Sequence, residues 1–128
     1  MVKPEREKIL TLYFVYHELN FVCMGIFMRM WMVDPKLMCR NHLLGEHREC
    51  HTLYGCLIIG RSIAGHLSRG QVEPQNLKAR HDALADEMSR RGYRHLSPLE
   101  NFPDAPFGLV DRDASLQELI RRCRNCRG

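Results

Sequence analysis

Apolar residues between positions 35 and 67 recur at intervals of three and four, the spacing of one face of a helix. Asp34-Pro35 precedes them and favours a helix start, because aspartate can accept hydrogen bonds from free amides and proline suits the first turn. Ser68-Arg69-Gly70 marks the end. We therefore predict a helical segment over 35–67, continuous or with one break. Its apolar positions are Leu37, Met38, Leu43, Leu44, Leu53, Tyr54, Leu57, Ile58, Ile63 and Leu67.

A second helix is predicted to begin near Glu73-Pro74 and to end at Gly92, because proline favours a first turn and glycine a helix end. Its apolar stripe consists of Leu77, Leu84 and Met88. Residues 93–112 contain three prolines, which predicts a loop that wraps around the domain.

A short third helix is predicted after this loop. Ser115-x-x-Glu118 has the pattern of a capping box, and Leu116, Leu119 and Ile120 would face inward. No stretch alternates apolar and polar residues well enough to predict a sheet. The predicted fold is therefore all-α, a compact single domain of about three main helices with a long wrapping loop.

Residues 9–27 are apolar, but polar side chains interrupt them too often for a membrane span. Basic residues come first, yet no small-x-small cleavage site of a signal peptide follows. We expect no membrane association. The chain is predicted to divide into an N-terminal extension, 1–27, outside the functional protein, and a helical domain, 28–128.

The net charge is +4, and four arginines near the end of the chain account for it. Such a basic segment suits a polyanionic partner such as nucleic acid. It is equally consistent with a solvated helix end whose cations face the negative end of the helix dipole. The arginines are Arg121, Arg122, Arg124 and Arg127.

The six cysteines show no regular spacing, so we interpret them as reduced thiols in a cytoplasmic, nucleoid or nuclear setting. Cys123-x-x-Cys126 has the spacing of half a zinc site. No second half lies at a suitable interval in the sequence. A structural zinc is therefore not expected from the spacing.

The densest polar cluster comprises His42, Glu46, His47, Glu49, Cys50 and His51. His47 and His51 are four residues apart, which is metal-ligand spacing on a helix, but the sequence fixes no third ligand. Neighbouring arginines would also disfavour a bound cation, so we expect no metal and no cofactor. Glu49 could act as a general base in a basic groove, although spacing alone favours a solvated glutamate.

A longer pattern resembles the pyrimidine-dimer DNA glycosylase family, whose best-known member is a small phage repair enzyme. The resemblance extends over about Met28 to Pro98. Its most specific part keeps the family's spacing without a gap and comprises Arg29, His42, Glu46, Arg48 and Glu49. Arg80-His81-Asp82 and Arg90-Arg91-Gly92-Tyr93 add to it.

This resemblance implies a base excision repair enzyme that binds damaged double-stranded DNA as a monomer and flips a base from the stack. It implies glycosylase and AP-lyase (endonuclease) activity on ultraviolet-induced pyrimidine dimers, with an N-terminal amine as nucleophile. Glu49 would be the catalytic carboxylate. Arg29 and Arg48 would hold phosphates, and His42 would help to position the opened sugar.

The sequence departs from the family in two respects. The phage enzyme presents a threonine as its first residue, whereas Met28 occupies that position here, and 27 residues precede it. We therefore expect the functional chain to start at Met28, whose α-amine would be the nucleophile. The end of the chain is also rich in arginine where the family has aromatic residues.

Two other functions remain open from the sequence. The scaffold could serve as a non-catalytic helical DNA-binding protein whose amine is lost or blocked. It could also be a metal-dependent nuclease that uses His47, Glu49 and His51.

Overall fold

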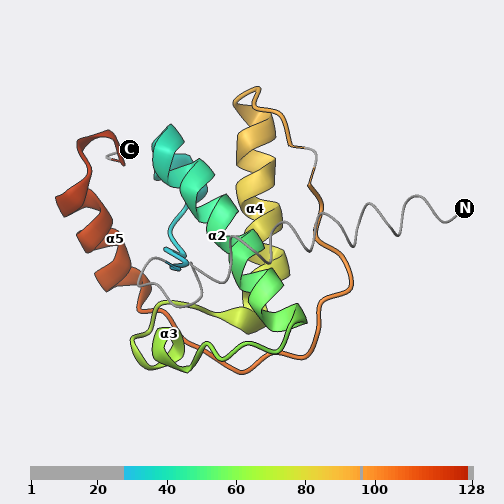
Figure 1. Cartoon of the computed structure of the whole chain (residues 1–128). Helices are drawn as coiled ribbons and strands as arrows, with labels where there is room; N and C mark the ends of the chain where they lie inside the picture. Colours follow the sequence, from blue (N-terminus) through green and yellow to red (C-terminus); the bar gives the residue numbers. More distant parts are fainter. Residues whose placement is uncertain (1–27, 96, 127–128) are drawn as a thin grey trace, which may run out of the picture.

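The computed structural model describes residues 28–95 and 97–126, and no strand occurs in these two stretches. The predicted all-α class is confirmed (Figure 1). None of the described helices is long and apolar enough to cross a membrane. The predicted extension 1–27 and Arg127 lie outside the described residues. The elements are η1 (Pro35–Leu37), α2 (Arg40–Ile58), α3 (Ala64–Ser68), η2 (Pro74–Asn76), α4 (Leu77–Arg90), α5 (Arg112–Arg122) and η3 (Arg124–Cys126).

The helical segment predicted over 35–67 is divided into three pieces. Asp34 caps only the short η1, where its Oδ1 accepts a hydrogen bond from the Lys36 amide at 3.0 Å. The long helix α2 begins at Arg40 instead, with Cys39 as its N-cap residue. The predicted break lies at Gly60, whose φ of +70° is readily adopted by glycine and ends the helical path before α3.

Helix α4 confirms the prediction for the second helix. Pro74 opens the 3-10 turn η2 that leads into it, and Gly92 follows its end with a φ of +84°. The predicted stripe of Leu77, Leu84 and Met88 is buried. Figure 1 shows α4 alongside α2, and these two helices make the most extensive contact in the domain.

Helix α5 begins three residues before the predicted capping box, so that prediction is wrong. Asp111 is the N-cap residue and accepts a hydrogen bond from the Ala114 amide at 3.0 Å. Ser115 is buried one turn inside, where its Oγ donates to the Trp31 carbonyl at 2.6 Å. The hydroxyl satisfies a buried carbonyl that no local pattern reveals. Figure 1 shows α5 on the side of α2 away from α4.

A buried carboxylate and an arginine join η1 to the end of α4. Arg91 Nη2 donates to the carbonyls of Pro35 at 3.0 Å and Met38 at 2.7 Å. Its Nε donates to Glu87 at 3.0 Å, and Arg90 also donates to this carboxylate. These hydrogen bonds from Arg90 and Arg91 lower the pKa of Glu87 to about 2.

The depressed pKa of Glu87 predicts a pH-dependent contribution to stability. The ionised form is favoured in the folded state, so its stabilisation is present above the ordinary pKa of 4.5 and is lost as the pH falls towards 2. We expect Glu87→Gln to lower the melting temperature near neutral pH, and the gap to wild type to narrow below pH 4.5. Thermal unfolding followed by circular dichroism at several pH values would measure it. Asp104→Asn, at an exposed position, is the control, and a gap that stays constant with pH would contradict the prediction.

Candidate active site

Glu49 lies on α2 and points towards the first residues of the helical domain. Its carboxylate accepts a hydrogen bond from the Arg29 backbone amide. Met28, the residue before that amide, is buried, with 1% of its surface exposed. The carboxylate therefore lies next to the peptide unit that joins Met28 to Arg29.

The surroundings of Glu49 favour its protonated form. Burial, together with the nearby charge of Glu46, raises the pKa of its carboxyl to about 8. The Arg29 amide and the guanidinium groups of Arg29 and Arg48 act in the opposite direction. Glu49 is thus a half-buried group among charged side chains, unlike the solvated glutamate that its spacing alone favoured.

Arg29 lies across the same region with its side chain held by two contacts. Its Nη2 donates to Glu118 of α5 at 2.6 Å, and its guanidinium lies 3.8 Å from the centre of the Trp31 ring. Arg48 is exposed on α2 and close enough to act electrostatically on Glu49. The structure thus brings Met28, Arg29, Arg48 and Glu49 together.

A buried ion pair lies close to Glu49. Arg80 of α4 donates through Nε and Nη2 to the two carboxylate oxygens of Glu46, and through Nη1 to the Val33 carbonyl at 2.6 Å. Both side chains are almost fully buried. The pair connects α2, α4 and the segment that follows Arg29. Glu46 and Arg80 both belong to the family pattern in the sequence, but their pairing was not predicted.

Comparison with known protein families identifies the domain. The model of the pyrimidine dimer DNA glycosylase family matches residues 28–101, more than half of the chain. The chain belongs to this family. Neither the curated proteins nor the solved structures include a significant match to it. The matched segment starts at Met28 and includes Arg29, Arg48 and Glu49.

The glycosylase domain brings four histidines into one cluster. His47 and His51 come from α2, His81 from α4 and His95 from the segment after it. The centre of the His47 ring lies 4.8 Å from those of His51 and His81 and 4.7 Å from that of His95. Burial, together with repulsion from the other histidines, lowers the pKa of His47 to about 3 and that of His51 to about 4.

The Nε2 atoms of these four histidines are unusual. All four are buried and have no hydrogen-bond partner among the described residues. Leaving a buried polar atom unpaired costs about 1–3 kcal/mol. Four such atoms in one place therefore call for a common partner. The sequence supplied only the His47–His51 pair, because the other two histidines are distant in the chain.

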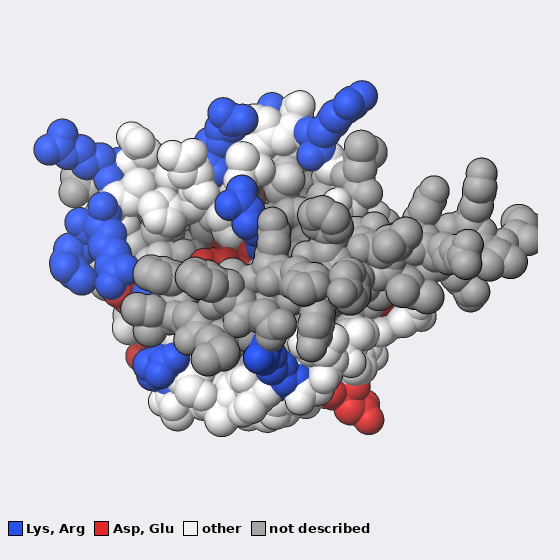
Figure 2. Space-filling model, viewed as in Figure 1, with Lys and Arg blue, Asp and Glu red and all other residues white. Residues whose placement is uncertain are grey.

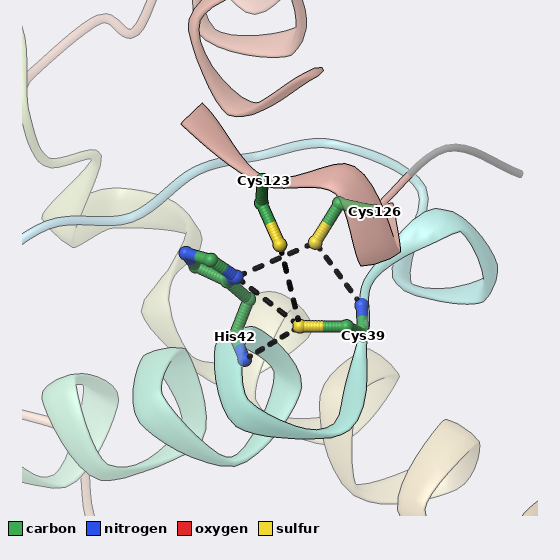
Figure 3. Close-up of side chains that lie close together, drawn as sticks. All are labelled: Cys39, His42, Cys123 and Cys126. Carbon is green, nitrogen blue, oxygen red and sulfur yellow. Dashed lines mark hydrogen bonds between the residues drawn. The ribbon is translucent and has the colours of Figure 1, made fainter. Parts of the chain in front are cut away.

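A second cluster contains His42, the fifth predicted site residue. His42 does not lie with Glu49 in the same arrangement but faces three cysteines, Cys39, Cys123 and Cys126 (Figure 3). Its Nδ1 is 3.2 Å from Cys39 Sγ and 3.4 Å from Cys126 Sγ. The missing second half of the Cys123-x-x-Cys126 pair is thus Cys39 and His42 at the start of α2. The predicted contact of His42 with DNA stays a prediction.

The cysteines differ from one another in state. Cys39, Cys50, Cys123 and Cys126 are free thiols, as predicted. Cys56 is disulfide-bonded, so the prediction of six reduced thiols is wrong for this residue.

Basic side chains are gathered over α5, at the left edge of the view in Figure 2. Arg121, Arg122 and Arg124 are exposed there. Arg122 pairs with Glu118 at 2.6 Å, the same carboxylate that binds Arg29. The end of the glycosylase domain therefore places positive charge on the side of the molecule that also holds Arg29.

Proposed function

We propose that this chain is a DNA glycosylase with AP-lyase activity on ultraviolet-induced pyrimidine dimers in double-stranded DNA, and that the Met28 α-amine is its nucleophile. One observation carries the proposal beyond family membership. The Glu49 carboxylate accepts a hydrogen bond from the Arg29 amide, one residue from the Met28 nitrogen. A carboxylate in this place can act on chemistry that begins at that nitrogen.

The chemistry follows from the properties of an α-amine. Its ordinary pKa is near 8, so a useful neutral fraction exists near pH 7, whereas a lysine is almost fully protonated there. The nitrogen lone pair forms a bond to the sugar C1′, and the bond from C1′ to the damaged base breaks with the base as leaving group. The nitrogen then loses a proton and the sugar ring opens to give an imine.

The imine makes the second step possible. It withdraws electrons from C2′, so a proton leaves that carbon and the C3′–O bond to the phosphate breaks. A positive charge that forms beside Glu49 would favour the ionised form of its carboxyl, so Glu49 would give up its proton, stabilise the cationic intermediate and carry protons between these positions. This role requires the carboxylate near the nitrogen, and the hydrogen bond that Glu49 accepts from the Arg29 amide, one residue away, supports it.

Binding to DNA would rest on arginines. Arg48 is exposed, and both Arg48 and Arg29 are close enough to Glu49 to act on it electrostatically. Phosphate contacts of this kind give affinity that falls as the salt concentration rises. Flipping a damaged base costs less than flipping a normal one, because the stacking of the lesion is already impaired. We include His42 as a predicted DNA contact and expect the protein to act as a monomer in the compartment that holds the DNA.

The proposal requires a free amine at Met28. In the 128-residue chain this nitrogen forms a peptide bond with Phe27, and an amide cannot form an imine. We therefore propose that the active form starts at Met28. Because Arg29 follows, the initiator methionine would be retained and would itself be the nucleophile.

Borohydride trapping on duplex DNA with one thymine dimer tests this proposal. The form that starts at Met28 should give a covalent protein–DNA product, and the 128-residue form should give none. A form with one glycine before Met28 is the matched control, because it displaces the amine by one residue without adding a segment. Equal trapping by the 128-residue form would contradict the assignment, and the intact mass of the native protein would show where it starts.

The non-catalytic alternative gives a different result in the same assay. A DNA-binding protein on this scaffold would bind dimer-containing duplex in both lengths and give no covalent product in either. A nuclease that depends on a metal at His47, Glu49 and His51 would cleave the strand but give no covalent product with borohydride.

A further inference from the structure

We propose that this domain binds two structural zinc ions, one at Cys39, His42, Cys123 and Cys126 and one at the four histidines. The two sites rest on separate observations. Neither depends on the proposed repair activity, because metal content can be measured without DNA. The proposal replaces the expectation of no metal and no cofactor that the sequence alone supported.

The cysteine site has the dimensions of a zinc tetrahedron. Zn–S bonds of about 2.3 Å and Zn–N bonds of about 2.0–2.1 Å place two sulfur atoms about 3.8 Å apart and a sulfur and a nitrogen about 3.6 Å apart. The Sγ atoms of Cys39 and Cys123 are 3.8 Å apart. His42 Nδ1 lies 3.2 Å and 3.4 Å from the sulfur atoms of Cys39 and Cys126.

The direction of the side chains agrees with these distances. Figure 3 shows all four ligand atoms pointing towards one another, from the start of α2 and from the turn η3. The sulfur atoms also accept backbone N–H groups, Cys126 from Cys39 at 3.1 Å and Cys39 from His42 at 3.5 Å. Hydrogen bonds of this kind surround metal-bound thiolates and fix their orientation. The thiol pair is too far apart for a disulfide, whose sulfur atoms are about 2.05 Å apart.

The histidine site rests on its unpaired nitrogen atoms. One ring nitrogen from each of His47, His51, His81 and His95 lies within 4.8 Å of the others. The buried Nε2 atom of every one lacks a partner in the described parts of the chain. A single divalent metal would pair all four at once. His81 has the further hydrogen bond that orients a metal-bound imidazole, from its Nδ1 to Asp82 at 3.0 Å.

Four protein ligands make each site closed. Structural zinc sites fill all four positions with protein, whereas catalytic sites keep one for water or substrate. Both sites therefore hold the fold and do not activate water. The cysteine site fixes η3, and with it α5, to the beginning of the helix that carries Arg48 and Glu49. The histidine site fixes α2 to α4 and to the segment at His95.

Metal content measured by mass spectrometry tests both sites in the full 128-residue chain after reconstitution with Zn²⁺ and removal of excess metal. We expect two zinc ions per chain. Cys126→Ser should lose one of them, and His81→Gln should lose the other. Cys50→Ala and His66→Gln are matched controls, because these residues are buried and outside both clusters, and each should keep two.

Two measurements on the unaltered chain keep the test decisive if a variant fails to fold. Cobalt in place of zinc should give sulfur-to-metal charge-transfer absorption, which only the cysteine site can produce. Zinc should also protect Cys39, Cys123 and Cys126 from alkylation, and a chelator should remove the protection.

Each outcome decides between the possibilities. A reconstituted chain that holds no zinc overturns both sites. A single zinc that disappears in Cys126→Ser and survives in His81→Gln overturns the histidine site, and the reverse result overturns the cysteine site. Two zinc ions that persist in both variants overturn the assignment of ligands. A DNA contact of His42 through Nδ1 is incompatible with its ligation, so loss of zinc on His42→Gln would favour the metal role.

Discussion

Replacing Glu49 with glutamine is expected to slow base removal and strand cleavage at pyrimidine dimers by about 10²–10⁴-fold, the usual contribution of a positioned acid–base group. Glutamine keeps the shape and the hydrogen bond from the Arg29 amide, but it cannot stabilise a cation by charge or transfer a proton. Binding to dimer-containing duplex should stay within a few-fold of wild type. The variant would be compared in the form that starts at Met28.

Single-turnover cleavage of an end-labelled duplex measures the rate, and fluorescence anisotropy measures binding. Glu100→Gln is the control, because it makes the same change at an exposed position outside the candidate site. A Glu49 variant that cleaves at the wild-type rate would show that the carboxylate takes no part in the mechanism. A variant that no longer binds DNA would show instead that Glu49 supports the binding surface.

Breaking the buried pair between Glu46 and Arg80 is expected to have the largest effect on stability. Arg80→Met leaves the Glu46 carboxylate buried without a partner, which typically costs about 3–5 kcal/mol in the free energy of unfolding. Removing both charges, as in Glu46→Leu with Arg80→Met, should recover much of this loss, because an apolar pair avoids the desolvation penalty. The double variant should therefore be more stable than the single one.

Urea unfolding at a fixed zinc concentration measures these differences. Lys78→Met is the control on the same helix, since it breaks the exposed ion pair between Lys78 and Asp82, whose side chains are 63% and 47% exposed. Exposed pairs contribute about 0–1 kcal/mol, so this variant should unfold almost as wild type does. Equal losses of unfolding free energy in Arg80→Met and Lys78→Met would show that the buried pair contributes no more to stability than the exposed pair.

Local patterns in the sequence were sufficient for the second helix and for the all-α class, but not for the bounds of the other helices. The stripe of Leu77, Leu84 and Met88 and the glycine at Gly92 fixed the second helix, because periodicity and helix ends depend on neighbouring residues. The capping box at Ser115 failed for a tertiary reason. The Ser115 hydroxyl donates a hydrogen bond to the Trp31 carbonyl, and Asp111 is the N-cap residue of α5 instead.

In the candidate site, too, local patterns failed where tertiary contacts decide the environment of a residue. Periodicity alone made Glu49 a surface glutamate, because the hydrogen bond that it accepts from the Arg29 amide comes from a segment outside the helix. Only the wider family pattern pointed to its role. The two clusters were beyond local spacing as well, since His81 and His95 join His47 and His51 through the packing of α4 on α2.

The cysteine cluster also bears on the order in which the domain is made. Its halves are separated by 84 residues between Cys39 and Cys123. During synthesis, α2 and α4 leave the ribosome and can pack together well before η3 is translated. A metal ion bound first by Cys39 and His42 would have only two of its four protein ligands until Cys123 and Cys126 are translated. Closure of the cysteine cluster would therefore follow the packing of α2 on α4 in the folding of the domain.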